Sequence, residues 1–413
     1  MAGTSFGKRG PGSGVAYAPA PLAATAGAPA SAAPDVWRGA APLTSQYLGP
    51  TCTIGILAVL ILVFLVQEAQ ALGGGSAGYG FNHRSLMALG ADSLSLIRQG
   101  QWWRVFTAPM LHANPGHLIG NGIVLALVGL RFERLIGWGW FLAVYFVSAI
   151  IGEFASLASI DPAAMGVGAS GAIMGLLSAM LVCSFHVGAK GQQIKMRWLA
   201  LRVMIPAMLP LGGNGAHAGM VINYSAHAGG AMAGVAMGLV INAVWPQDEP
   251  KPLGRLLAEW VGVVGMVATI GAFAMGALRY PEYQAINATL APDAEIPREE
   301  PQAVAASGTL EARYPKDPRV RLFVAMGDQQ VGLYSAASSE LATALGDTDQ
   351  LSELPPQTAA LLHAALAFSL LQQGDRDGAR AAAAPVCGYH FPSPKTGAAL
   401  NRFGLCRPAS GGG

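Results

Sequence analysis

The chain contains seven long, predominantly apolar stretches, separated by shorter polar connections. A bilayer core of about 30 Å needs about 20 apolar residues per helix. Each stretch approaches that length, so the pattern predicts seven membrane-spanning helices. We place them at Thr51–Leu72, Pro115–Phe132, Gly137–Ile160, Ala169–His186, Met196–Leu211, Ser225–Trp245 and Leu256–Leu278.

Composition supports a chain that largely avoids water. Of its 413 residues, 52% are hydrophobic and only 12% are charged, whereas soluble domains carry about 25% charged residues. The predicted fold class is therefore all-α, a polytopic membrane helix bundle. The net charge of +2, without a basic stripe, argues against a nucleic-acid partner. The four cysteines lack the spacing of a metal site.

The two ends of the chain differ from its centre. Residues 1–47 are rich in Ala, Pro and Gly, which predicts a disordered tail. Residues 281–413 predict a helical extramembrane region with turns at Gly327-Asp328, Pro355-Pro356 and Gly374-Asp375. Within it, residues 359–384 predict two helices joined by a short turn, a tetratricopeptide-like pair without enough repeats to define an array. In an oxidising compartment, Cys387 and Cys406 could form a disulfide.

The basic residues of the short connections predict an orientation. Connections on one side of the bundle carry Lys and Arg, whereas the opposite connections, Asp161–Gly168 and Gly212–Tyr224, have neither. The positive-inside rule then places the N-terminus in the cytoplasm and, after seven spans, the C-terminus outside. The Ala, Gly and Pro content is typical of a GC-rich genome, so we expect a bacterial inner membrane.

The first candidate for chemistry is Ser170, which opens the fourth apolar stretch among small residues. It lies in the sequence Gly168-Ala169-Ser170-Gly171, and Gly175 follows one turn later. Helix packing through small residues is an equally good interpretation of this motif. A serine at a helix start can also serve only as a cap.

The second candidate is His227 in the sixth stretch. Gly230 and Gly234 follow it at i+3 and i+7 and therefore share its helix face. Glycines on that face let another helix approach the imidazole closely. A lone membrane histidine is more often an interhelical hydrogen-bond partner, or a metal or proton site, but a nearby serine helix favours a Ser–His pair.

The third candidate is a pair of side chains at the start of the second stretch. His117 and Asn121 are at i and i+4, so they point the same way, and His112 precedes them. Two donors aimed at one place suit an oxyanion hole. The alternative is that they only connect helices by hydrogen bonds.

In combination, these motifs resemble the rhomboid family of intramembrane serine proteases. The resemblance rests on Trp103-Arg104, a His-xxx-Asn motif from His117 to Asn121, Glu133, a GxSGxxxG motif and an AHxxGxxxG motif. It covers about Thr51 to Trp245. It implies a six-helix catalytic core at residues 48–247, with an additional seventh helix at residues 248–280.

The resemblance also implies roles for the candidate residues. Ser170 is the expected nucleophile and His227 its base, with His117 and Asn121 stabilising the oxyanion. The supporting glycines are Gly168, Gly171, Gly175, Gly230 and Gly234. The expected substrates are transmembrane proteins in the lipid bilayer, cut near the outer face. The mechanism needs no cofactor or metal.

Two positions depart from the family pattern, and other functions stay open. Met174 stands where some members have a tyrosine, and Asn223 stands where an aspartate is frequent. These departures put the orientation of the imidazole in question. The alternatives are a catalytically silent rhomboid-like protein that binds membrane clients, and a transporter or metal site built on His112, His117 and His227. The Gly-rich segment from Leu211 to Gly215 is a candidate mobile cap.

Overall fold

A computed structural model describes residues 49–72, 83–159, 165–188, 190–209, 223–389, 391 and 393–406. The predicted tail at residues 1–47 and the candidate cap at Leu211–Gly215 lie outside these residues. The described chain is mostly helical, as predicted. It also contains one antiparallel pair of two-residue strands, β1 (Asp92–Ser93) and β2 (Met165–Gly166).

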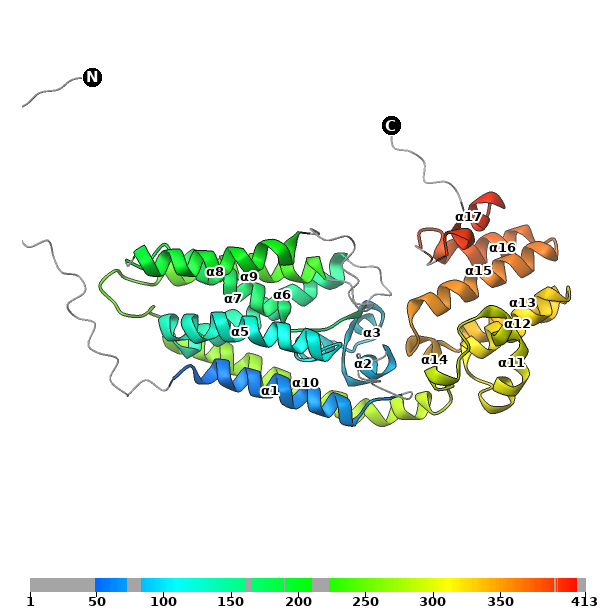
Figure 1. Cartoon of the computed structure of the whole chain (residues 1–413), viewed down its shortest axis with the longest axis horizontal. Helices are drawn as coiled ribbons and strands as arrows, with labels where there is room; N and C mark the ends of the chain where they lie inside the picture. The colour runs from blue at the N-terminus through cyan, green and yellow to red at the C-terminus, as the bar shows by residue number, and fades with distance from the viewer. Residues whose placement is uncertain are drawn as a thin grey trace, which may run out of the picture. The chain divides into compact units, whose positions relative to one another are not determined.

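A helix lies at each of the seven predicted stretches (Figure 1). They are α1 (Thr51–Ala69), α5 (Pro115–Ile136), α6 (Trp138–Ser159), α7 (Ser170–Cys183), α8 (Lys190–Met208), α9 (Tyr224–Ala243) and α10 (Arg255–Asn287). Four of them, α1, α6, α9 and α10, are long and apolar enough to cross a membrane, and α7 is a shorter apolar helix. The charged residues of α5 and α8 lower their apolar character, so seven spans remain a prediction.

The centre of the bundle consists of α6, α7 and α9, which lie side by side (Figure 1). Large side chains of α6 and α7, such as Phe141, Tyr145 and Ile173, are fully buried there. The outer faces of α1 and α10 instead expose large apolar side chains, including Leu62, Val264 and Leu278. Because such continuous apolar faces are unfavourable in water, they fit contact with lipid.

In the described part of the connection between α1 and α5, residues 83–114, the chain forms α2 (His83–Leu89), α3 (Leu94–Arg98), α4 (Arg104–Thr107) and η1 (Ala108–Met110). Buried Arg104 holds this connection together. Its guanidinium donates to the carbonyl oxygens of Met87 and Ala91, each at 2.7 Å, and to the Tyr283 hydroxyl of α10 at 2.6 Å. A buried charge needs such a full set of partners, which explains the Trp103-Arg104 motif.

Glu133, the acidic residue near the end of α5, caps the start of α1. Its carboxylate accepts from the backbone N–H groups of Cys52 at 3.0 Å and Thr53 at 2.7 Å, and from the Thr53 hydroxyl at 2.6 Å. The N-terminus of a helix attracts an anion because its first N–H groups have no partner within the helix. Glu133 therefore fixes α1 against α5.

The C-terminal region is helical, as predicted. It contains η2 (Asp293–Glu295), α11 (Glu300–Arg313), α12 (Pro318–Gln330), α13 (Tyr334–Gly346), α14 (Thr348–Ser352), α15 (Pro356–Gln372), α16 (Arg376–Ala383), η3 (Ala384–Val386) and α17 (Pro394–Arg402). The two-helix prediction for residues 359–384 is confirmed by α15 and α16. The turn at Gly327-Asp328 was wrong: both residues lie inside α12, whose buried face outweighs the low helix propensity of one glycine. A disulfide joins Cys387 to Cys406.

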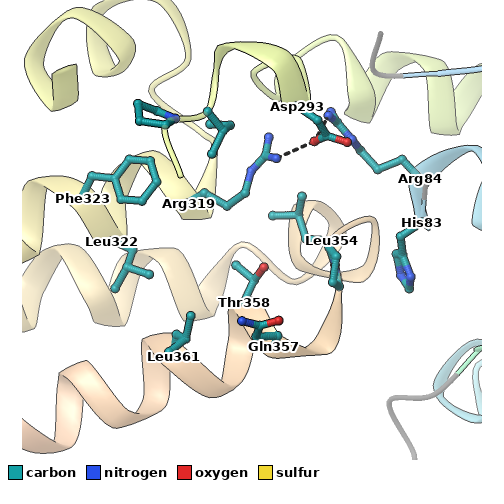
Figure 2. A pocket seen from close by; sticks show the side chains of 13 residues that line it. His83, Arg84, Asp293, Arg319, Leu322, Phe323, Leu354, Gln357, Thr358 and Leu361 are labelled. Atoms are coloured by element: carbon teal, nitrogen blue, oxygen red, sulfur yellow. Dashed lines mark hydrogen bonds and ion pairs between the residues drawn. The ribbon is translucent and has the colours of Figure 1, made fainter. Parts of the chain in front are cut away.

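Helix α2 contacts the C-terminal region around a cavity of about 420 Å³ (Figure 2). Asp293 joins the two parts, because its carboxylate binds Arg84 of α2 at 2.5 Å and Arg319 of α12 at 2.7 Å. Leucines from α12 and α15, Leu322 and Leu361, line the apolar side of the cavity. This contact attaches the C-terminal region to the connection that Arg104 organises.

A buried carboxyl group makes this contact sensitive to pH. Glu353 is fully buried, and neither of its carboxyl oxygens accepts a hydrogen bond from the described residues. Burial raises the pKa of Glu353 from 4.5 to about 8, although Arg104 and Arg84 oppose the shift. Between these values the folded chain holds a proton that the unfolded chain has lost, so stability falls as pH rises through this window.

We therefore predict that the melting temperature of the wild-type protein in detergent falls relative to that of Glu353→Gln as the pH rises from 5 to 9. The uncharged amide needs no proton, so the variant should be the more stable protein at pH 9. Differential scanning fluorimetry across this range measures both. Parallel pH dependences in the two proteins would show that the pKa of Glu353 is the same in the folded and the unfolded chain, and would contradict the prediction.

Candidate active site

Ser170 is the first residue of α7 and is half-buried. The cap position belongs to Ala169, and no side-chain cap bond forms at this helix start. The Ser170 hydroxyl makes no hydrogen bond to any described residue. The described residues therefore give no support to the interpretation of Ser170 as a helix cap.

The backbones of α7 and α9 touch through glycines. A Cβ atom added to Gly230 would lie 2.7 Å from the carbonyl carbon of Gly171, and one added to Gly234 would lie 2.6 Å from that of Gly175. Both distances are shorter than real side chains tolerate. Only glycine fits at these two positions, so the crossing of α7 and α9 is set by the motifs themselves.

This crossing brings the neighbours of Ser170 and His227 together. A Cβ atom on Gly171 would lie 3.3 Å from the carbonyl oxygen of Ala226. Ser170 precedes Gly171 and His227 follows Ala226, so the two candidate residues start from adjoining points of two helices. Gly152 of α6 completes the crossing, because its added Cβ would lie 3.0 Å from the same oxygen.

The imidazole of His227 is buried and has a defined partner. Its Nδ1 lies 2.8 Å from the carbonyl oxygen of Ala207 in α8. A carbonyl only accepts, so Nδ1 carries the hydrogen, and Nε2 is left as the acceptor in the neutral ring. Ser170 and His227, both described, make no hydrogen bond to each other. Catalytic hydrogen bonds are often long before substrate binds.

His117 and Asn121 face the segment that leads into α7. Gly168 has a φ of +121°, and an added Cβ there would lie 2.6 Å from Cε1 of His117 and 3.5 Å from Nδ2 of Asn121. Both the backbone angle and the crowding require glycine. The amide of Asn121 also contacts Nε2 of His112 at 3.1 Å. The sequence candidates at residues 117, 121 and 168 therefore lie together beside Ser170.

Some residues of this site were not predicted from the sequence. Ala207 contributes only its backbone carbonyl group, and Gly152 contributes only the space left by its missing side chain. The sequence therefore does not mark either residue as functional. Asn223 was noted only as a departure; its side chain caps α9 by accepting from Ala226 N–H at 3.0 Å. Met174 is buried in the apolar core. Within the described residues, no group of three or more His, Cys, Asp or Glu side chains forms a candidate metal site.

Comparisons with known proteins identify the domain that holds this site. Residues 99–243 match the rhomboid domain. The chain is 37% identical to rhomboid protease GluP of Bacillus subtilis (strain 168) over 186 residues. These residues make up 45% of this chain and 34% of that protein. It is 35% identical over 176 residues to rhomboid-like protease 3 of Toxoplasma gondii, covering 43% of this chain and 65% of that protein.

A third relative, rhomboid protease AarA of Providencia stuartii, is 29% identical over 146 residues, or 32% of this chain and 50% of that protein. The matches thus span between a third and two thirds of the length of these relatives. The chain contains a rhomboid domain, and its homologues are rhomboid proteases. The rhomboid-domain match at residues 99–243 lies within the Thr51–Trp245 region that carries the resemblance.

A single methyl group added at the glycine contact should strongly lower the stability of the protein. Gly230→Ala should destabilise the protein by about 1–3 kcal/mol, as overpacking usually does, and should also reduce proteolysis, because the helices must separate. The matched control is Gly271→Ala in α10, where nothing lies within 4 Å of an added Cβ. Thermal unfolding in detergent checks the prediction. Equal stability of the two variants would contradict it.

Proposed function

We propose that this multi-pass membrane protein is an intramembrane serine endopeptidase that uses Ser170 and His227 as a catalytic dyad. The observation that supports it most is the close contact between Gly171 of α7 and Ala226 of α9, the chain neighbours of Ser170 and His227. The homology to rhomboid proteases supports the same reaction class.

The geometry supports a definite division of roles. Ser170 Oγ attacks the scissile carbonyl while Nε2 of His227 takes its proton and later returns it to the leaving amine. The carbonyl of Ala207 orients the ring in place of the usual aspartate, because it accepts from Nδ1. His117, Asn121 and the backbone N–H of Ser170 then surround the developing oxyanion, where fixed donors contribute most.

The proposed substrates are transmembrane segments whose helix is weakened near the outer face. Proteolysis requires an extended peptide bond at Ser170, and a regular helix hides its peptide bonds. The orientation proposed is an N-terminus in the cytoplasm and a C-terminal region outside, in a bacterial inner membrane. The disulfide between Cys387 and Cys406 supports an oxidising location for that region.

Removing either dyad member should abolish cleavage. We predict that Ser170→Ala and His227→Ala each lower kcat by about 10³-fold or more in the purified protein, measured with a quenched fluorescent transmembrane substrate in liposomes. His186→Ala is the control, because His186 follows the opposite end of α7 and stacks on Trp245. It should keep its activity.

Labelling separates the protease from a silent client-binding protein. A fluorophosphonate should modify Ser170 in the wild-type protein and react much more slowly in His227→Ala. Retained cleavage in either dyad variant would refute the dyad. A wild-type protein that neither cleaves nor reacts at Ser170 would instead support the client-binding alternative.

The role of Asn121 can be separated from a structural hydrogen bond. Asn121→Ala should lower kcat by about 10²–10³-fold, the usual cost of one oxyanion donor, with little change in KM. The control is Asn242→Ala, which removes an interhelical hydrogen bond of 3.2 Å to Val182 at the other end of α9. If both variants lose only stability, Asn121 merely connects helices.

A further inference from the structure

Asp92 is hydrogen-bonded to the segment before α7 and, through Ser156 of α6, is linked to the start of α9. It belongs to β1, in the connection between α1 and α5, and its side chain is buried. We propose that Asp92 is a positioning residue. Its carboxylate fixes the segment that leads to Ser170 (residues 165–169, the serine segment) relative to α9, the histidine helix, which carries His227. This inference rests on the proposed function for its catalytic consequence, although the structural link itself does not.

One carboxylate oxygen fixes the approach to Ser170. Oδ1 accepts from the backbone N–H of Gly166 in β2, the strand that pairs with β1. Gly166 lies four residues before Ser170. The same segment is held a second time, where Gly168 N–H donates to the carbonyl oxygen of Ala108 at 2.9 Å. The backbone that enters α7 therefore takes its position from the connection containing Asp92.

The other oxygen fixes the start of the histidine helix through two side chains. Oδ2 of Asp92 accepts from the Ser156 hydroxyl at 3.3 Å, and Ser156 Oγ accepts from Nδ2 of Asn223 at 2.6 Å. Oδ1 of Asn223 accepts from Ala226 N–H at 3.0 Å. His227 is the next residue. Three hydrogen bonds thus lead from Asp92 to the turn that carries the imidazole.

Glu153 of α6 supplies a second buried carboxyl group near Asp92. The two oxygens of Asp92 accept from the Gly166 N–H and from the Ser156 hydroxyl, and a carboxylate offers an acceptor on each oxygen. Among the described residues, no hydrogen bond joins Glu153 to Gly166 or to Ser156. The contribution of Asp92 is therefore its pair of acceptor oxygens, which its neighbour does not supply.

This assignment separates two isosteric substitutions. Asp92→Asn leaves a single acceptor oxygen, so the variant cannot hold Gly166 and Ser156 as the carboxylate does. Glu153→Gln leaves both acceptor oxygens of Asp92 in place. A mere preference for a carboxyl group in a polar cluster would make both substitutions equally harmful, whereas an acceptor role for Asp92 makes only the first one harmful.

The experiment uses the full-length protein in liposomes with a transmembrane substrate. We expect Asp92→Asn to lower kcat by about 10–100-fold, as expected for a displacement of about 1 Å at a reacting group, with KM changing much less. Glu153→Gln should retain most of the rate. The matched control is Thr53→Val, which removes a buried hydrogen bond of 2.6 Å to the Glu133 carboxylate between α1 and α5.

A double-mutant cycle tests the path to His227. If Asp92 acts through Asn223, then Asp92→Asn combined with Asn223→Ala should be little worse than the more damaging single variant. Additive losses in kcat would overturn the path. Equal losses in Asp92→Asn and Thr53→Val would reduce Asp92 to an ordinary stabilising residue and overturn the proposal.

Hydrogen exchange tests the link without any activity. Asp92→Asn should accelerate exchange in peptides covering residues 165–168 and 223–227 together, and Thr53→Val should leave both unchanged. Acceleration in the first peptide alone would overturn the link to the histidine helix. If the wild-type protein shows no Ser170-dependent cleavage, the proposed function fails, but the exchange result still decides whether Asp92 joins the two elements.

Discussion

The candidate site depends on the backbone contact between α7 and α9. Gly171 and Gly175 on one helix meet Gly230 and Gly234 on the other so closely that a single Cβ atom would overlap with the opposite backbone. Helices in lipid gain little from burying apolar surface against each other, so small residues and close van der Waals packing determine which faces meet. The same contact brings the residues beside Ser170 and His227 together.

Buried polar groups fix the positions of the helices and connections that the glycine contact does not determine. Glu133 caps α1, and Arg104 connects the segment after α1 to α10. Asp92 accepts from Gly166 in the serine segment and from Ser156 of α6, which is hydrogen-bonded to the start of α9. Unpaired groups of this kind are costly in a dry interior. Each one therefore selects a single arrangement of its neighbours. Arg104 and Asp92 do so in the connection that holds the segment entering α7, and Glu133 does so near the other end of α5.

The sequence was sufficient for features that depend on local pattern. Apolar length predicted a helix at each of seven places, and the small-residue spacing around Ser170 and His227 predicted the faces that meet. The turn at Gly327-Asp328 was wrong because packing of α12 outweighed local propensity. Likewise, α10 continues to Asn287, beyond the apolar stretch that ended at Leu278. The roles of Asp92 and Ala207 depend on partners far along the chain, which no local pattern reveals.

The most direct test of the central claim is chemical cross-linking of the two side chains. An amino-chloroisocoumarin acylates a serine and then exposes an electrophile that alkylates a nucleophile within a few ångströms. If the α7–α9 contact brings the dyad together, mass spectrometry should find one inhibitor joining the peptide of Ser170 to that of His227. An inhibitor attached to Ser170 that never reaches His227, even after long incubation, would contradict the account.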